Sequence, residues 1–169
     1  MSHYTDTPPT FAVERARASK LQNIADFMTA VTSAKDSYTP TLTNINVGTT
    51  GTTVGVYKQI GKKIEGSVVI TFNGTGMSNG TAPSITLPVA PHARYINASA
   101  LALPVGAAEL ADTGTGNWKG SLMVLSGSTA TIFYHTEAGG DGISQISAGT
   151  PYTVAATDVW RLLFEYDAA

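Results

Sequence analysis

The sequence predicts a mainly β protein, an antiparallel β-sandwich of jelly-roll-like type that is preceded by one N-terminal α-helix. After residue 37, short runs of β-branched and aromatic residues alternate with turn residues at intervals of roughly 8–12 residues, as in sandwiches and barrels. Because no helical crossover pattern separates these runs, a parallel α/β sheet is disfavoured. Residues 11–34 contain neither glycine nor proline and are rich in good helix formers.

Residues 1–36 are expected to form an extended arm followed by an attachment helix. The arm ends in Pro8-Pro9, which cannot lie inside a helix. Thr10 is a suitable N-cap, and Glu14 follows in the first turns, where the helix dipole favours a carboxylate. The helix is therefore predicted to begin near residue 10 and to end near Ala34.

This predicted helix carries one apolar stripe. Leu21, Ile24, Met28 and Val31 recur at intervals of three, four and three residues, and Phe27 widens the stripe. A helix cannot bury such a stripe alone, so the stripe must pack on the β-domain, on sister copies or on another protein. We expect these five residues to form an attachment or oligomer interface.

Residues 37–169 are expected to form the β-sandwich domain. Gly61-Lys62 and Ser126-Gly127-Ser128 supply compact hairpin turns, and glycine- and threonine-rich stretches supply the longer loops. The predicted strands cover residues 38–47, 52–60, 62–73, 83–89, 94–104, 117–126, 129–136 and 158–166. The predicted loops cover residues 48–53, 73–81, 112–117 and 138–142.

The composition excludes several classes of protein. Charged residues make up 13% of the chain, about half the usual share, and the net charge is −2, so a strongly basic nucleic-acid binder is not expected. The absence of cysteine excludes disulfides, thiolate zinc sites and cysteine nucleophiles. No apolar run approaches the roughly 20 residues of a membrane span, and the first residues lack the apolar segment of a secretion signal.

No catalytic or cofactor-binding motif emerges, so we expect neither an enzyme nor a bound cofactor. The sequence has no phosphate-binding loop and no Gly-x-Ser-x-Gly nucleophile turn. His135 and Glu137 share one face at a strand end, and Asp141 follows two glycines. These three residues are a candidate cation rim, but a hairpin rim of solvated polar residues is the favoured interpretation, and the ligands are too few for zinc.

Low charge on a β-rich chain suggests an oligomer. Exposed sheet edges and apolar faces aggregate unless they are covered, and closed symmetric association covers them. The charge is also unevenly distributed. Residues 1–106 have eight basic and five acidic side chains, a net charge of +3, and residues 107–169 have two basic and seven acidic side chains, a net charge of −5. A basic cluster at Arg15, Arg17 and Lys20 precedes the apolar stripe, where it forms either a solvated helix end or a contact for an acidic partner.

Several segments of the first half resemble small bacteriophage virion proteins of the minor tail or fibre type. These segments are Pro8-Pro9-Thr10-Phe11, Leu21-Gln22-Asn23, the run from Tyr38 to Asn44, the run from Gly55 to Ile64, and Leu87-Pro88-Val89. The resemblance implies a β-sandwich domain that is usually trimeric and is attached to the particle through its N-terminal segment. It implies a role in tail structure, head decoration or receptor binding.

The expected function is therefore that of a virion structural protein assembled in the host cytoplasm. We expect a homo-oligomer, with a trimer favoured by the resemblance, that contacts other virion proteins through residues 1–35. The alternative is a carbohydrate-binding module that recognises host-surface glycans. In that case Asn117, Trp118 and Tyr134 are the candidate ligand-facing residues.

Overall fold

The structure is a computed structural model that describes residues 11–97, 103–135 and 142–169, with side chains for all of these except 11–18, 27 and 30. The chain forms two compact units, Met1–Ala34 and Lys35–Ala169. We refer to the second unit as the β-body. Each unit is described by itself.

The helix of the first unit, α1, extends over Phe11–Thr32 and confirms the predicted helix. At its C-terminal end the Ser33 amide donates to the carbonyl of Thr29 at 2.8 Å, which continues the helical pattern by one bond. The Thr32 hydroxyl donates to the carbonyl of Met28 at 2.8 Å. This bond from a threonine hydroxyl to the carbonyl four residues earlier is a local pattern that threonine commonly forms on helices.

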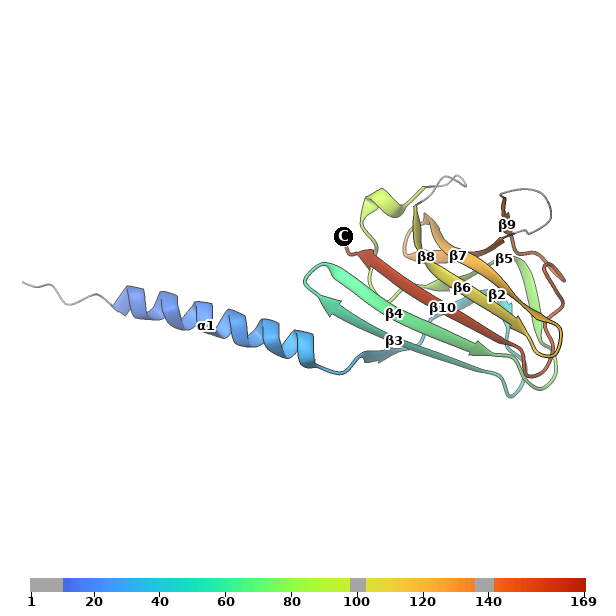
Figure 1. Cartoon of the computed structure of the whole chain (residues 1–169), viewed down its shortest axis with the longest axis horizontal. Helices are drawn as coiled ribbons and strands as arrows, with labels where there is room; N and C mark the ends of the chain where they lie inside the picture. Colours follow the sequence, from blue (N-terminus) through green and yellow to red (C-terminus); the bar gives the residue numbers. More distant parts are fainter. Residues whose placement is uncertain (1–10, 98–102, 136–141) are drawn as a thin grey trace, which may run out of the picture. The chain divides into compact units, whose positions relative to one another are not determined.

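The β-body is one ten-stranded antiparallel sheet that curls into a half-barrel (Figure 1). The prediction of a mainly antiparallel β protein with one N-terminal helix is thereby confirmed. The strands are β1 Asp36–Tyr38, β2 Leu42–Asn46, β3 Thr52–Ile60, β4 Lys63–Thr71, β5 Ser78–Thr86, β6 Pro104–Asp112, β7 Gly116–Ser126, β8 Thr129–His135, β9 Ile143–Gln145 and β10 Val159–Asp167. Their spatial order is β1-β3-β4-β10-β6-β7-β8-β5-β2, and β9 pairs with β8.

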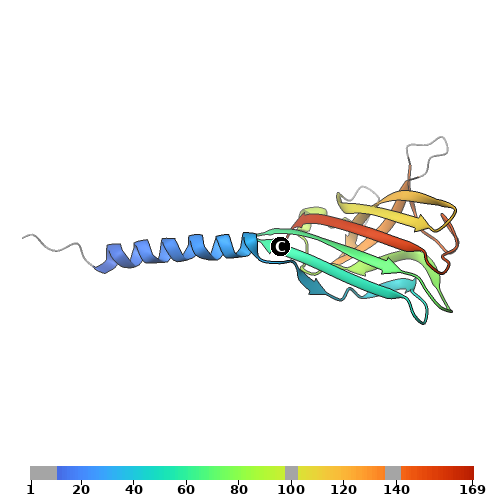
Figure 2. The ribbon, with the colours of Figure 1, turned by 60° about the horizontal axis from the view of Figure 1, so that its bottom comes forward.

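The C-terminal strand, β10, joins two separate hairpin systems into this sheet. It lies between β4 and β6, so that Leu162 is opposite Val68 on one side and opposite Ala108 on the other. Figure 2 shows it as the red strand between green β4 and yellow β6. Since β6, β7 and β8 are consecutive hairpin partners, the order β10-β6-β7-β8 is a Greek key.

Along β4 and β10 the buried residues of the inner face alternate with exposed or half-buried residues of the outer face. In β7 and β8 consecutive residues are buried, because Met123 and Phe133 form a small second cluster. In β10, every second residue from Trp160 to Tyr166 is buried, and the residues between them are mostly exposed. The Trp160 indole N–H donates to the hydroxyl of Tyr152 at 2.7 Å, and its ring meets Phe72 edge-on at 5.2 Å. Burial raises the pKa of the Tyr152 phenol well above its usual range. The Trp160 and Tyr152 side chains therefore enter the core with their polar atoms paired to each other.

The predicted strand over residues 94–104 is wrong in its described part before Pro104, and residues 98–102 lie outside the described residues. Residues Ala93–Tyr95 form a 3-10 helix, and His92 caps it by accepting the Arg94 amide on its Nδ1 atom at 3.2 Å. The strand of this region begins only at Pro104, at a strand start where a missing N–H is tolerated. Its sequence is poor in β-branched residues, so pairing with β10 and β7, rather than local propensity, makes it a strand.

The predicted strand over residues 38–47 is two strands at opposite ends of the sheet. Tyr38 in β1 pairs with Gly55 of β3, whereas Leu42 in β2 pairs with Ile85 of β5. The buried Pro40 between them has no N–H to donate to a ladder, so the strand is interrupted there. The short connection therefore links one edge of the half-barrel to the other.

The predicted loop over residues 73–81 is also wrong in its second half, because β5 begins at Ser78. Asn79 is buried, pairs with Ile45 of β2, and donates from its side-chain amide to the carbonyl of Ser147 at 2.9 Å. A buried amide with a fixed partner orders this end of the strand despite its polar sequence.

One buried hydroxyl predicts a stabilising substitution. Among the described residues, Tyr38 Oη is the buried side-chain polar atom that has no hydrogen-bond partner. Its ring lies edge-on to Tyr57 at 5.7 Å and to Phe164 at 6.2 Å. Because Tyr38→Phe keeps these contacts and removes an unpaired polar atom, we expect it to raise the free energy of unfolding by about 1 kcal/mol. Urea denaturation followed by circular dichroism measures the change.

The matched control is Tyr166→Phe. The Tyr166 hydroxyl donates to the carbonyl of Val89 at 2.7 Å, so its removal is expected to lower the free energy of unfolding by about 1 kcal/mol. Opposite signs for the two variants support the assignment. A loss of stability in both would show that the Tyr38 hydroxyl is hydrogen-bonded in solution.

Candidate functional site

The apolar stripe of α1 is exposed. The exposed fractions are 67% for Leu21, 59% for Ile24, 55% for Met28 and 41% for Val31. At about 100° per residue these four side chains lie within roughly a quarter of the helix circumference. The Phe27 side chain, the fifth member of the predicted interface, lies outside the described residues.

The other side of the helix is polar. The side-chain amide of Gln22 donates to Asp26 Oδ1 at 2.7 Å, one turn further along. Asn23 and Thr29 are also exposed on the helix surface. The described part of α1 is therefore amphipathic, with a narrow apolar face.

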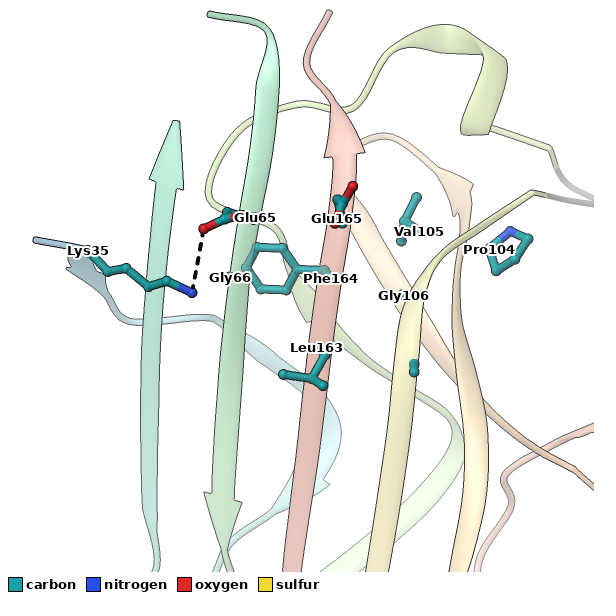
Figure 3. Close-up of a pocket in the computed structure, with 10 residues that line it drawn as sticks. Lys35, Glu65, Gly66, Pro104, Val105, Gly106, Leu163, Phe164 and Glu165 are labelled. Carbon is teal, nitrogen blue, oxygen red and sulfur yellow. Dashed lines mark ion pairs between the residues drawn. The ribbon is translucent and has the colours of Figure 1, made fainter. Parts of the chain in front are cut away.

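A groove of about 530 Å³ crosses the outer face of the β-body, where β6 separates from β10 (Figure 3). The pairing of these two strands ends at Phe164 and Gly106. Beyond that point β6 follows β7 alone, with a bulge between Pro104 and Gly106. The separation of the strands opens the groove.

Close backbone contact beside this groove depends on two glycines. A Cβ atom at Gly106 would lie 2.0 Å from the carbonyl oxygen of Leu163, and one at Gly66 would lie 2.4 Å from that of Val56. No side chain fits at such distances, so the strands approach each other here only through glycine.

The groove combines apolar residues with paired charges. Leu163, which is 59% exposed, lines the groove from β10. Lys35 Nζ lies 3.9 Å from Glu65 Oε1, and Lys63 Nζ lies 2.7 Å from Glu165 Oε1. Such a surface suits contact with an apolar group of a partner, and the carboxylates are already engaged by lysines.

A second charge cluster lies on the same outer face. Glu109 accepts a hydrogen bond from Lys119 at 2.9 Å, and Arg161 approaches its other oxygen at 3.8 Å. The hydrogen bond from Lys119 and the positive charges lower the pKa of the Glu109 carboxyl. These residues form an exposed ion-pair network rather than an acid–base pair.

The predicted ligand-facing residues do not share one surface. Trp118 is half-buried on the inner face and stacks on Tyr152, with ring centroids 4.7 Å apart and an interplanar angle of 19°. Tyr134 also packs against the core, whereas Asn117 is exposed. Consecutive strand residues point to opposite faces, so the strand geometry separates Asn117 from Trp118.

Asn117 instead lines a shallow hollow of about 330 Å³ formed by residues 111–117 at the β6–β7 turn. The turn is polar and rich in glycine and threonine. It offers one exposed amide and no exposed aromatic ring for stacking.

The candidate cation rim is described only at His135. Its Nε2 atom lies 3.0 Å from the hydroxyl oxygen of Ser121, on the exposed outer face. Glu137 and Asp141 lie outside the described residues. Within residues 11–97, 103–135 and 142–169, no group of three or more His, Asp or Glu side chains is arranged to hold a metal ion.

The groove was not predicted, but β10 contains a signal that indicates it. Along this strand the inward residues are apolar, and the outward residues Arg161 and Glu165 are charged. Leu163 between them breaks the alternation, because it is an apolar residue on the outward face. An apolar residue at a solvent-facing strand position marks a surface that a partner can cover.

No helix in the described part of the chain has the length and hydropathy that crossing a bilayer requires. No family model, no curated protein and no solved structure matches this chain.

Proposed function

We propose that the chain is a bacteriophage virion structural protein of the tail, fibre or head-decoration type, in which α1 is the attachment element and the β-body is the displayed domain. One observation carries the proposal: the four described side chains of the apolar stripe are not covered by any other described part of their own unit. An amphipathic helix whose apolar face its own unit leaves uncovered is suited to bind a partner. The resemblance of the first half to virion proteins supplies the setting, a particle assembled in the host cytoplasm.

We further infer that the half-barrel serves as the jelly-roll-like sandwich of this proposal. Its strands contribute to one buried cluster, with Val68 and Leu162 from β4 and β10 and Leu122 and Ile132 from β7 and β8. Inner faces that share one core are the defining feature of a sandwich. A homo-oligomer, with a trimer favoured by the resemblance, would cover the apolar outer face around Leu163.

A non-enzymatic role is part of the same proposal. The carboxylates beside the groove are paired with lysines, and Glu109 is held by Lys119. No described nucleophile is placed beside an activated base in the groove. These observations favour a binding or structural surface over a reaction site.

The carbohydrate-binding alternative stays a prediction. A sugar would stack on the exposed face of an aromatic ring, but the Trp118 ring already stacks on Tyr152. Of the three candidate residues only Asn117 is exposed. No observation favours a glycan site over a protein contact. The two functions are compatible, since a displayed virion domain can bind sugars.

Removal of residues 1–34 tests the proposed function. Because its core is complete without α1, we expect the truncated protein to keep the far-ultraviolet circular dichroism spectrum of a β protein. We also expect it to be absent from purified particles when it is supplied in place of the full chain. Quantitative immunoblotting of the particles measures incorporation.

The control is the full chain supplied in the same way, which is expected to be incorporated normally. Incorporation of a folded truncated protein at the level of the full chain would show that α1 does not attach it. A truncated protein with the spectrum of an unfolded chain would contradict the independence of the β-body.

A further inference from the structure

We propose that the exposed stripe of α1 is the seam of a parallel coiled coil formed by three or four copies of this chain. The inference rests on the proposed function, in which α1 binds a partner, and it names second copies of the chain as the residues that cover the stripe. It follows from the register of the stripe and from the side-chain types at its positions.

The stripe follows a coiled-coil heptad. Intervals of three, four and three residues place Leu21 and Met28 at the a positions and Ile24 and Val31 at the d positions. All four side chains are more than 40% exposed, as the knobs of a coiled-coil seam are before the helices associate. One further heptad in the N-terminal direction would place Glu14 and Arg17 in the seam, so the apolar contact begins at Leu21.

The side-chain types at these positions indicate the number of helices. Two-stranded coiled coils favour β-branched residues at a and leucine at d. Here the arrangement is reversed, because the unbranched or γ-branched residues Leu21 and Met28 are at a, and the β-branched residues Ile24 and Val31 are at d. Leucine at a with isoleucine at d shifts the preference to three or four strands.

The flanking positions agree with more than two helices. Ala25 is at e and Phe27 is at g, so the sequence widens the apolar face beyond the a and d positions. A wider face is buried when each helix contacts two neighbours. On the opposite side, the hydrogen bond between Gln22 at b and Asp26 at f stays in solvent.

The proposed assembly has cyclic symmetry, in which all copies are related by one rotation axis. Identical helices related in this way have the same direction along that axis, so the helices are parallel. The seam from Leu21 to Val31 is only two heptads long, which is short for a coiled coil without other contacts. The β-bodies, joined to the helices through the adjacent residues Ser33 and Ala34, are therefore expected to contribute further contacts.

The first experiment measures the mass of the full chain by sedimentation equilibrium. We expect three or four times the chain mass of 17.6 kDa. Ile24→Lys is expected to give single chains, whereas the adjacent control Asn23→Lys, at an exposed c position, is expected to keep the wild-type mass. A wild-type mass of one or two chains, or an Ile24→Lys mass equal to that of the control, would overturn the proposal.

A second variant tests the register while conserving hydrophobicity. Exchanging the side-chain types, with Leu21→Ile, Ile24→Leu, Met28→Ile and Val31→Leu together, creates the pattern that favours two strands. We expect the mass to change from three or four chains to two. An unchanged mass would show that the a and d assignment is wrong.

Cysteine cross-linking tests the parallel direction, because the wild-type chain has no cysteine. In parallel helices Val31→Cys brings equivalent thiols together, so oxidation is expected to give a linked pair of chains on denaturing gels. In antiparallel helices residue 31 would face residue 21, and no such pair would form. Asn23→Cys is the control that should stay unlinked in either case.

The outcomes separate this inference from the proposed function. A wild-type chain that is monomeric in solution but whose Ile24→Lys variant is lost from particles would show that α1 attaches to a different virion protein. The seam would then be wrong while the proposed function stands. A wild-type mass of three or four chains, with full incorporation of the protein lacking residues 1–34, would support the seam and overturn attachment through α1.

Discussion

Trp160→Ala is expected to lower the free energy of unfolding of the β-body by about 4 kcal/mol, because truncation of a large buried aromatic side chain has one of the largest effects of any single substitution. The Trp160 side chain is fully buried, and its removal leaves a cavity between β10 and the chain around Phe72. It also removes the donor that pairs with the Tyr152 hydroxyl, which leaves a buried oxygen without that bond. Urea denaturation followed by circular dichroism measures the loss.

Two control variants on the same strand distinguish the contribution of burial from that of the N–H group. Leu163→Ala lies on the same strand but on the outer face, so a change within about 0.5 kcal/mol is expected. Trp160→Phe restores part of the ring volume without the N–H group and is expected to lose about 2 kcal/mol. Equal losses for Trp160→Ala and Leu163→Ala would contradict the inward orientation of Trp160.

This inward orientation could be predicted from the sequence, because apolar residues occupy every second position of β10 from Trp160 to Tyr166. In β4 the buried inward positions are occupied by apolar residues and one glycine, namely Ile64, Gly66, Val68 and Ile70. The predicted strand over residues 62–73 contains the observed strand. For such strands the local sequence predicts which side chains point inward, and the structure has these side chains buried.

The strands that were missed are those whose structure depends on distant partners. β6 has alanine and glycine where a strand signal would need β-branched residues, and it is a strand because β10 and β7 pair with it on both sides. The strand order itself could not be predicted either. No local pattern indicates that the last strand inserts between β4 and β6. Pro40, by contrast, is a local signal of the division between the two edge strands, which the prediction of one strand over residues 38–47 overlooked.

The candidate site also combines features that local sequence predicts with features that depend on distant parts of the chain. The exposed stripe of α1 follows from helical periodicity alone, and the structure agrees for the four described side chains. The groove depends on the point at which β6 separates from β10, which is a tertiary feature, so only the misplaced apolar residue Leu163 indicated it. For Trp118, composition suggested a ligand contact, but its stacking partner Tyr152 is 34 residues further along the chain and could not be anticipated.

A buried carboxylate gives the second large effect, because Asp158→Ala is expected to lower the free energy of unfolding by about 3 kcal/mol. Asp158 is 1% exposed and accepts two backbone hydrogen bonds, from the Thr113 amide at 2.9 Å on Oδ1 and from the Ala155 amide at 2.7 Å on Oδ2. Hydrogen bonds to a charged group contribute about 1.5–3 kcal/mol each, and their loss leaves the two amide donors without this acceptor. The side chain thus ties the β6–β7 turn to the turn before β10.

The matched control is Asp167→Ala, which removes a carboxylate of the same kind from the exposed ion pair with Arg94 and is expected to cost at most about 1 kcal/mol. Asp158→Asn separates shape from charge, since its amide can accept only one of the two bonds and turns a donor toward the other backbone N–H. We therefore expect Asp158→Asn to lose at least half as much stability as Asp158→Ala in the same urea titration. If Asp158→Ala lost no more than Asp167→Ala, the hydrogen bond from the Thr113 hydroxyl to the carbonyl of Thr157 would be sufficient to hold the two turns together, and the buried charge would not be needed.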